Sequence, residues 1–311
     1  MESLDEKILD VVQNGFPLEE RPYLALGKML GLSEEQAFER VEGLRKSGVI
    51  RRLGGVYNSR ALGFVSRLCA GVVPEDRLDA FAAAVDKIPA ITHNYVRSHA
   101  YNVWFTVIAR SEAEIQELVR GLEAETDLHD AHVLSASRMF KINTVMGKAA
   151  SGNVAGQVSK SAESFVPNEK DRSRINMLSK DIPHTQTPFS DLGIDPSEIR
   201  GDLDHKIMRR FGAVLRHQDA GFVANSMVCL SVTKPEVAGA ELAALPFVSH
   251  CYERDAFEGF PYNLYAMVHA CSGEELEKFV DEVAHVSNAK DYARLDSLKE
   301  LKKTSFYFFE S

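Results

Sequence analysis

The chain has 311 residues, 45% of them hydrophobic and 26% charged, which is typical of a folded protein with more than one core. No stretch approaches the roughly 18 uninterrupted apolar residues of a membrane-spanning helix, and residues 1–5 show no signal-peptide pattern, so we expect a cytoplasmic protein without membrane contact. The net charge of -9 opposes binding of a polyanion by the molecule as a whole, and the four scattered cysteines are expected to be buried free thiols.

Residues 1–60 predict a winged helix-turn-helix unit. Apolar residues at helical spacing predict a first helix from Leu4 to Val12 and a second from Tyr23 to Leu30. A third helix is expected after Ser33, a suitable N-cap, and to end at Gly48. Three helices followed by a short extended stretch are the order of a winged helix-turn-helix.

Residues 61–146 predict a ferredoxin-like βαββαβ domain. The alternation of apolar and polar residues predicts strands and helices in the order 64–73, 74–87, 91–97, 101–109, 111–122 and 132–145. This order gives a four-stranded antiparallel sheet with both helices on one face. Residues 147–167 are rich in Gly, Ser, Ala and Lys, as linkers are.

The second half of the chain repeats the first. I-R-R-L-G-G-V at 50–56 recurs as M-R-R-F-G-A-V at 208–214, and G-F at 63–64 recurs at 221–222. T-H-N-Y-V-R at 92–97 recurs as S-H-C-Y-E-R at 249–254, and Y-N-V-W at 101–104 recurs as Y-N-L-Y at 262–265. Collinear matches indicate a tandem duplication. We therefore expect an α+β pseudo-dimer, with a second winged helix-turn-helix at 168–218 and a second βαββαβ domain at 219–311, whose last strand is expected at 301–309.

These local motifs resemble the siroheme decarboxylases, which are built on the Lrp/AsnC regulator fold. The resemblance covers each copy and implies that two subunit types are fused here in one chain. It implies non-oxidative removal of two acetate carboxyls from siroheme, giving 12,18-didecarboxysiroheme for haem or haem d1 synthesis. The partners would be siroheme and its product, and no cofactor beyond the iron of siroheme is expected.

The chemistry of siroheme indicates which residues to consider. Its carboxylates suit the bidentate fork of arginine, so seven arginines are candidate clamps: Arg51, Arg52, Arg97, Arg209, Arg210, Arg216 and Arg254. Alternate residues of a strand share a face, so two H-x-Y-x-R strands each present three groups together: His93, Tyr95 and Arg97, and His250, Tyr252 and Arg254.

Loss of CO2 requires a proton at the carbon left behind, so a general acid is needed. His250, Tyr252 and His217 are the candidate catalytic residues, all in the second copy. His93, His99 and His217 are candidate axial ligands of the siroheme iron, and no resident metal site is expected. Tyr262 and Asn263 are further candidate substrate contacts, with sheet core as the alternative.

Two other functions stay open. The fold alone favours an Lrp/AsnC-type transcriptional regulator, and the arginine pairs would then contact DNA phosphates. A haem sensor or carrier without catalysis is the third possibility. The third-helix segments 34–40 and 195–202 carry acids where a recognition helix needs donors, so we expect no specific DNA binding. The halves are expected to pair through their sheets, and further homo-oligomers stay possible.

Overall fold

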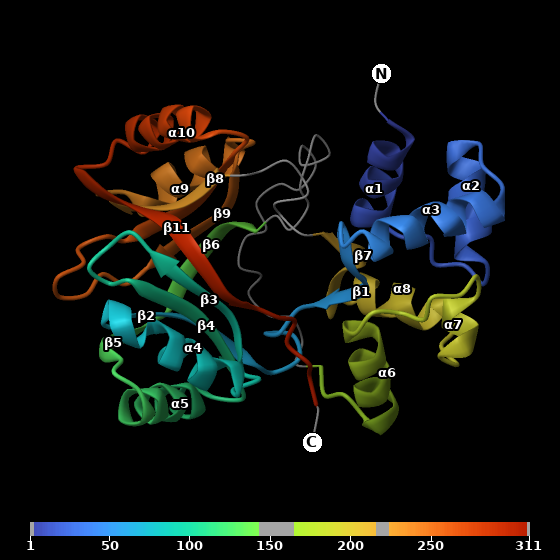
Figure 1. Cartoon of the computed structure of the whole chain (residues 1–311), viewed down its shortest axis with the longest axis horizontal. Coiled ribbons are helices and arrows are strands. Elements are labelled where there is room, and N and C mark those ends of the chain that lie inside the picture. Colours follow the sequence, from blue (N-terminus) through green and yellow to red (C-terminus); the bar gives the residue numbers. More distant parts are fainter. Residues whose placement is uncertain (1–2, 143–164, 216–223, 310–311) are drawn as a thin grey trace.

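The computed structural model describes residues 3–142, 165–215 and 224–309. Most of the expected linker, and also Arg216, His217 and the second Gly-Phe pair, lie outside these residues. The helical units of both copies gather at one end of the molecule, and the sheets lie at the other (Figure 1). No helix in the described ranges is long and apolar enough to cross a membrane.

Each helical unit has three helices and one strand. In copy one these are α1 (Leu4–Asn14), α2 (Pro22–Leu30), α3 (Glu34–Lys46) and β1 (Ile50–Tyr57). In copy two they are α6 (Glu169–Ser179), α7 (Pro188–Asp191), α8 (Pro196–Asp204) and β7 (Met208–Leu215). Ser33 caps α3 as expected, with a reciprocal hydrogen-bond pair to Gln36.

The two helical units share one core because β1 and β7 pair with each other. They form an antiparallel two-stranded sheet, so the extended stretch after each third helix completes the other copy. The first glycine of I-R-R-L-G-G-V, Gly54, and the glycine of M-R-R-F-G-A-V, Gly212, explain why the strands can lie so close to the other copy. A Cβ on Gly54 would lie 2.4 Å from Lys180 O, and one on Gly212 would lie 2.4 Å from Val12 O. Only glycine allows each strand to approach the other copy this closely.

The remaining elements form a nine-stranded sheet in the order β5-β2-β4-β3-β11-β8-β10-β9-β6. Copy one contributes β2 (Val65–Val72), a short 3-10 turn (Glu75–Arg77), α4 (Leu78–Asp86), β3 (Ile91–Arg97), β4 (Val103–Ala109), α5 (Glu112–Glu125), β5 (His129–Leu134) and β6 (Ala136–Ile142). Copy two contributes β8 (Ala224–Ser231), α9 (Pro235–Ala244), β9 (Val248–Arg254), β10 (Leu264–Ala270), α10 (Gly273–Val286) and β11 (Asp291–Lys303).

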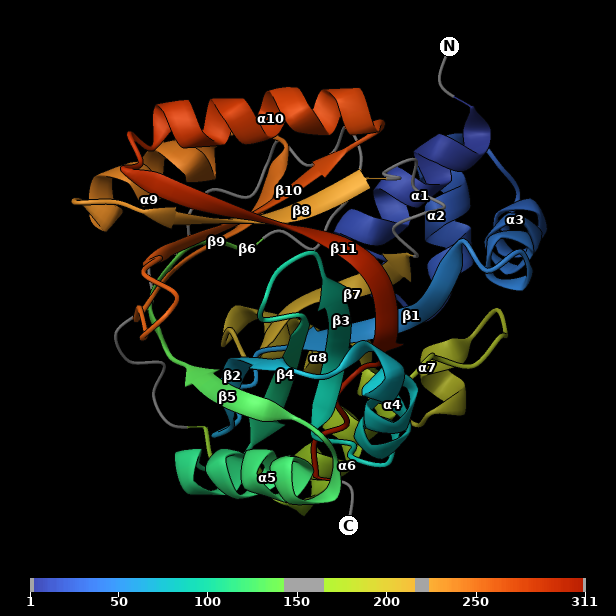
Figure 2. The same ribbon diagram turned by 60° about the vertical axis from the view of Figure 1, so that its left-hand side comes forward.

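The last strands differ from the prediction because they are exchanged between the copies. The stretch expected as one strand at 132–145 is divided: β5 pairs with β2 of its own copy, and β6 pairs with β9 of the other. The last strand is β11 rather than 301–309, and it pairs first with β8 and then with β3 (Figure 2). Periodicity predicts that a segment is extended, but it does not identify the strand's partner.

The two half-sheets contact each other face to face, and the helices cover their outer faces. A buried cluster between the half-sheets contains Trp104 and Leu134 of copy one with Phe260 and Tyr265 of copy two. Separate cores lie under α4 and α5 and under α9 and α10. The expected contact between the sheets is therefore present, and it holds the H-x-Y-x-R strands of both copies near the centre of the molecule.

Candidate functional site

Each H-x-Y-x-R strand contains a β-bulge just before its histidine. The register moves from Ile91↔Val107 to His93↔Thr106 in copy one, and from Val248↔Val268 to His250↔Met267 in copy two. The extra residue is Thr92 in the strand of copy one and Ser249 in the strand of copy two. Bulges redirect side chains and are common beside active sites. Here each bulge turns the histidine, tyrosine and arginine away from the core of their own copy.

Arg97 and Arg254, two of the predicted carboxylate clamps, each donate to a backbone carbonyl of the other copy. Arg97 Nη1 donates to Leu295 O at 3.0 Å, and Arg254 Nη1 donates to Leu134 O at 3.0 Å. Leu295 lies in β11 of copy two and Leu134 in β5 of copy one, so each arginine donates to the other copy. Each guanidinium also lies against the tyrosine of its own motif, 5.3 Å from the Tyr95 ring centroid in copy one. These arginines tie the two copies together beneath the tyrosines.

Arg52 and Arg210, two further predicted clamps, also donate to backbone carbonyls. Arg210 Nη1 donates to Gln13 O at 2.7 Å and to Ala213 O at 2.8 Å. Arg52 donates from both terminal nitrogens to Gly55 O at 3.3 Å. Both guanidinium groups fold back onto their own strand and stabilise the β1–β7 pair.

In copy one, Arg51 and Tyr95 bind the chain's own C-terminal segment. Arg51 donates to Lys303 O at 3.2 Å and to Ser305 Oγ at 3.4 Å. Tyr95 donates its phenol proton to Glu300 at 3.2 Å. Burial raises the pKa of Tyr95, and the Glu300 carboxylate adds to the rise. In copy one, an anionic group and a peptide segment therefore lie against two side chains that were predicted to bind substrate.

In copy two, the equivalent groups are not engaged in this way. Met139 lies opposite Tyr252 on the neighbouring strand, in the position that Glu300 has beside Tyr95. Among the described residues, neither the Tyr252 phenol nor the Arg209 guanidinium has a hydrogen-bond or ion-pair partner, and Arg209 is exposed. Copy two therefore offers a phenol and a cation beside an apolar wall.

The histidine of copy two is neutral at physiological pH. Burial lowers the pKa of His250 to about 4, and the charges of Arg209 and Lys141 add to this effect. Burial also raises the pKa of Tyr252, against the opposing charges of Arg254 and Arg209. His250 Nδ1 lies 2.8 Å from Ser249 Oγ, so only Nε2 remains to meet a ligand.

Three other predicted residues lie elsewhere or serve the fold. The Asn263 amide bonds both the N–H and the carbonyl of Val232 at 3.0 Å, and Tyr262 donates to Asp291 at 3.2 Å in an exposed position. His99 follows the C-terminal end of β3, whereas His93 lies near the start of that strand. His99 Nδ1 accepts a hydrogen bond from the Tyr101 amide, and its ring packs edge-on against Phe260. Among the described residues, none of these three side chains forms a hydrogen bond with an H-x-Y-x-R side chain, although the Asn263 carbonyl accepts from the Arg254 amide at 3.0 Å.

Sequence analysis missed His269 on β10, which lies beside the copy-two motif. His269 Nε2 is 2.9 Å from Ser249 Oγ, and both side chains are buried. Aligning the two copies through their Tyr-Asn pairs places Ile108 at the equivalent position of β4. A polar residue that replaces an apolar one in only one copy was the signal that would have identified it.

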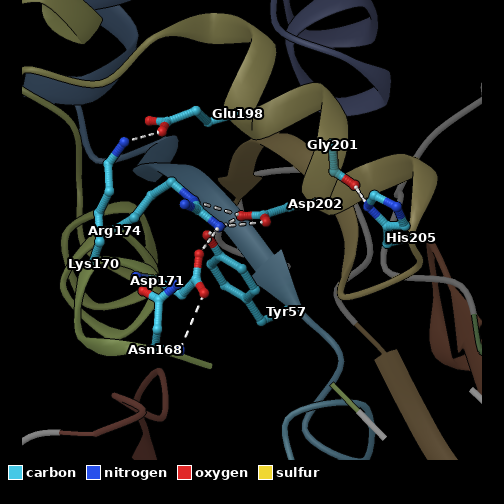
Figure 3. Close-up of polar contacts among 9 residues, drawn as sticks. All are labelled: Tyr57, Asn168, Lys170, Asp171, Arg174, Glu198, Gly201, Asp202 and His205. Carbon is cyan, nitrogen blue, oxygen red and sulfur yellow. Dashed lines mark hydrogen bonds and ion pairs between the residues drawn. The ribbon is translucent and has the colours of Figure 1, made fainter. Parts of the chain in front are cut away.

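A buried ion-pair network joins the copies on the inner side of α8 (Figure 3). Arg174 pairs with Asp202 at 2.8 Å and with Asp171 at 3.0 Å, and Tyr57 of copy one donates to Asp202 at 3.3 Å. On the other third helix, Arg45 is buried and pairs with Glu42. Within the described ranges, no group of three His, Cys, Asp or Glu side chains is arranged to hold a metal ion.

Comparisons with known proteins agree with this architecture. Residues 61–141 and 219–302 match the AsnC-like ligand binding domain, and residues 5–51 match the siroheme decarboxylase NirDL-like HTH domain. The chain is 31% identical to siroheme decarboxylase of Hydrogenobacter thermophilus, over 98% of this chain and 94% of that one. It is also 31% identical to the siroheme decarboxylase NirDL subunit of Paracoccus denitrificans, over 91% and 89% of the two chains.

A solved structure shows the same arrangement over the whole chain. The siroheme decarboxylase NirDL in co-complex with an iron-uroporphyrin III analogue superposes with a TM-score of 0.74 at 27% identity, covering 99% of this chain and 95% of that one. The siroheme decarboxylase alpha subunit of Desulfovibrio desulfuricans is 48% identical over 46% of this chain and 82% of its own.

Proposed function

The chain belongs to the siroheme decarboxylase family, and from this premise we propose that it removes two acetate carboxyls from siroheme without oxidation, giving 12,18-didecarboxysiroheme. The reaction is a carbon-carbon lyase reaction. We place it in the copy-two site, formed by the H-x-Y-x-R face of β9 and Arg209 of β7. The observation that supports this placement is the contrast between engaged groups in copy one and available groups in copy two.

Each group of the copy-two site has a role in this reaction. Arg209 binds a substrate carboxylate, because an exposed guanidinium is a bidentate donor for such groups. The apolar wall at Met139 and the Tyr252 ring contact the macrocycle, and His250 Nε2 faces the reacting acetate. As CO2 leaves, the electrons of the broken C–C bond pass into the pyrrole system, and the remaining carbon takes one proton from His250 or Tyr252.

The remaining expectations belong to the same proposal. The iron of siroheme is part of the substrate, and no further cofactor is required, because the macrocycle itself accepts the electrons. Buried Cys69, Cys229 and Cys251 are free thiols and suit a reducing cytoplasm. His217 of copy two remains the candidate iron ligand and Arg216 a candidate clamp, whereas His93 lies in copy one, which this proposal leaves outside the reaction. Whether the product feeds haem or haem d1 synthesis depends on the enzymes that follow.

The test is anaerobic incubation of the purified protein with siroheme, followed by mass spectrometry of the tetrapyrrole. We expect a product that has lost the mass of two CO2 molecules. A tetrapyrrole that is bound but unchanged after prolonged incubation would contradict the proposal and favour a sensor or carrier.

A further inference from the structure

The bulge in β9 places a hydroxyl between two imidazoles. Ser249 Oγ lies 2.8 Å from His250 Nδ1 and 2.9 Å from His269 Nε2. Its distance to Met267 O is longer, at 3.3 Å. Ser249 and His269 are each only 8% exposed, so bulk water has little access to these contacts. The two short contacts form a continuous hydrogen-bonded chain from β10 to the proposed catalytic histidine.

A serine hydroxyl donates one hydrogen bond and accepts up to two. It can therefore accept from His269 Nε2–H and donate to His250 Nδ1 at the same time. In this arrangement His250 carries its proton on Nε2, which is the nitrogen that is not used inside the protein. The same geometry allows the protons to shift along the chain.

We propose that Ser249 and His269 form a proton relay that supplies His250 during decarboxylation; the proposal rests on the function proposed above. Each lost CO2 consumes one proton, which moves from His250 Nε2 to the substrate carbon. His250 Nδ1 then takes the Ser249 proton, Ser249 takes the Nε2 proton of His269, and His269 Nδ1 takes a proton that comes ultimately from solvent. Each imidazole changes tautomer, and one proton enters as one leaves. Before the second CO2 is lost, the protons shift back along the same chain, as His250 Nε2 gains a proton and His269 Nδ1 loses one, so that His250 again carries its proton on Nε2.

The relay explains how a histidine that resists protonation can still donate. With its pKa lowered to about 4 by burial and nearby cations, His250 is almost never an imidazolium at neutral pH. A relay through its second nitrogen requires no charged imidazole at any step. Ser249 and His269 act through His250 and do not touch the substrate, so they are positioning residues.

Copy one has the hydroxyl and the first imidazole of the relay but lacks the second imidazole. This difference between the copies provides matched control variants. Thr92 Oγ1 lies 2.9 Å from His93 Nδ1, as Ser249 does from His250. Ile108, however, stands at the position of His269. Thr92→Val therefore removes the same hydroxyl from the copy that lacks the second imidazole. Ser249→Thr places the residue of copy one in copy two and retains the hydroxyl.

The experiment compares Ser249→Val, Ser249→Thr, His269→Ile and Thr92→Val. With saturating siroheme under anaerobic conditions, we expect Ser249→Val and His269→Ile to lower kcat about tenfold or more with KM unchanged, because proton supply is lost. Ser249→Thr and Thr92→Val should stay near the wild-type value. Equal kcat in Ser249→Val and the wild type would overturn the relay.

A second measurement does not depend on catalysis. Nitrogen-15 NMR of the ligand-free protein reports which His250 nitrogen carries the proton, and we expect Nε2–H in the wild type and in Ser249→Thr. Ser249→Val should change this tautomer population, and an unchanged population would overturn the role of Ser249. If the wild type leaves siroheme intact, the proposed function fails, whereas the NMR result still tests the hydrogen-bonded chain.

Discussion

At the scale of single residues, the two copies differ in which cations are free to bind a ligand. Arg51 donates to Lys303 O and Ser305 Oγ, whereas its counterpart Arg209 is exposed and has no partner among the described residues. A repeated motif therefore does not imply a repeated function. The position of a neighbouring chain segment decides whether an arginine binds substrate or its own backbone.

This difference predicts the effect of a matched pair of variants. Arg209→Ala should weaken binding of siroheme by about 1.5–3 kcal/mol, the usual contribution of a charge-assisted contact. Arg51→Ala should leave binding within about twofold of wild type. Absorbance titration of the two purified variants checks this, and the reverse order of affinities would place the ligand in copy one.

His250 also predicts how stability depends on pH. The pKa of His250 is lowered to about 4 in the folded protein, against about 6.5 in an unfolded chain. Above pH 6.5 both states are neutral, and between these values only the unfolded chain binds the proton. The free energy of unfolding should therefore fall as pH drops from about 6.5 to 4, by roughly 3 kcal/mol at most.

Denaturant unfolding at about pH 7 and pH 4.5 measures this loss in the wild type and in His250→Gln. The variant has no imidazole to protonate, so it should lose less stability between the two pH values. Equal losses in both proteins would show that His250 is not held neutral by the fold.

At the scale of elements, sequence analysis identified the helices and most strands, because each has a clear apolar period and several have capping residues such as Ser33. It did not identify the exchange of β6 and β11 between copies. Alternation also does not show whether an arginine such as Arg254 reaches a ligand or a carbonyl of the other copy. Long-range pairing decides both, and a single sequence carries no signal for it.

The repeated glycines of β1 and β7 give a prediction at this scale. Gly212→Ala places a methyl group 2.4 Å from the Val12 carbonyl, and this backbone atom cannot move freely. We expect the free energy of unfolding to fall by about 2 kcal/mol or more. Gly43→Ala is the control, because it lies in α3 with open space around it and should raise stability by roughly 0.5–1 kcal/mol. Thermal unfolding of both variants checks the contrast, which equal melting temperatures would contradict.

At the scale of the whole molecule, the exchanged strands and the β1–β7 pair make one folded unit from two regulator-like copies. The third helices are part of this unit. Arg174 and Tyr57 contact the inner side of α8 at Asp202, and the buried Arg45 of α3 pairs with Glu42. Their acidic first turns and these internal contacts leave few donors for phosphates.

We therefore predict that the protein does not bind duplex DNA specifically. Fluorescence anisotropy with labelled promoter fragments at physiological salt should show only weak, sequence-independent retention. Submicromolar, sequence-dependent binding would contradict this prediction and favour a regulator.

The central claim is that decarboxylation takes place in copy two, and one comparison tests it most directly. His250→Gln with Tyr252→Phe alters the copy-two site, and His93→Gln with Tyr95→Phe makes the same changes in copy one. Each double variant is incubated anaerobically with saturating siroheme, and loss of CO2 is followed by mass spectrometry. We predict that the copy-one variant converts siroheme at the wild-type rate and that the copy-two variant is slower by about 100-fold or more. Wild-type conversion by the copy-two variant, with loss of activity in the copy-one variant, would contradict the account.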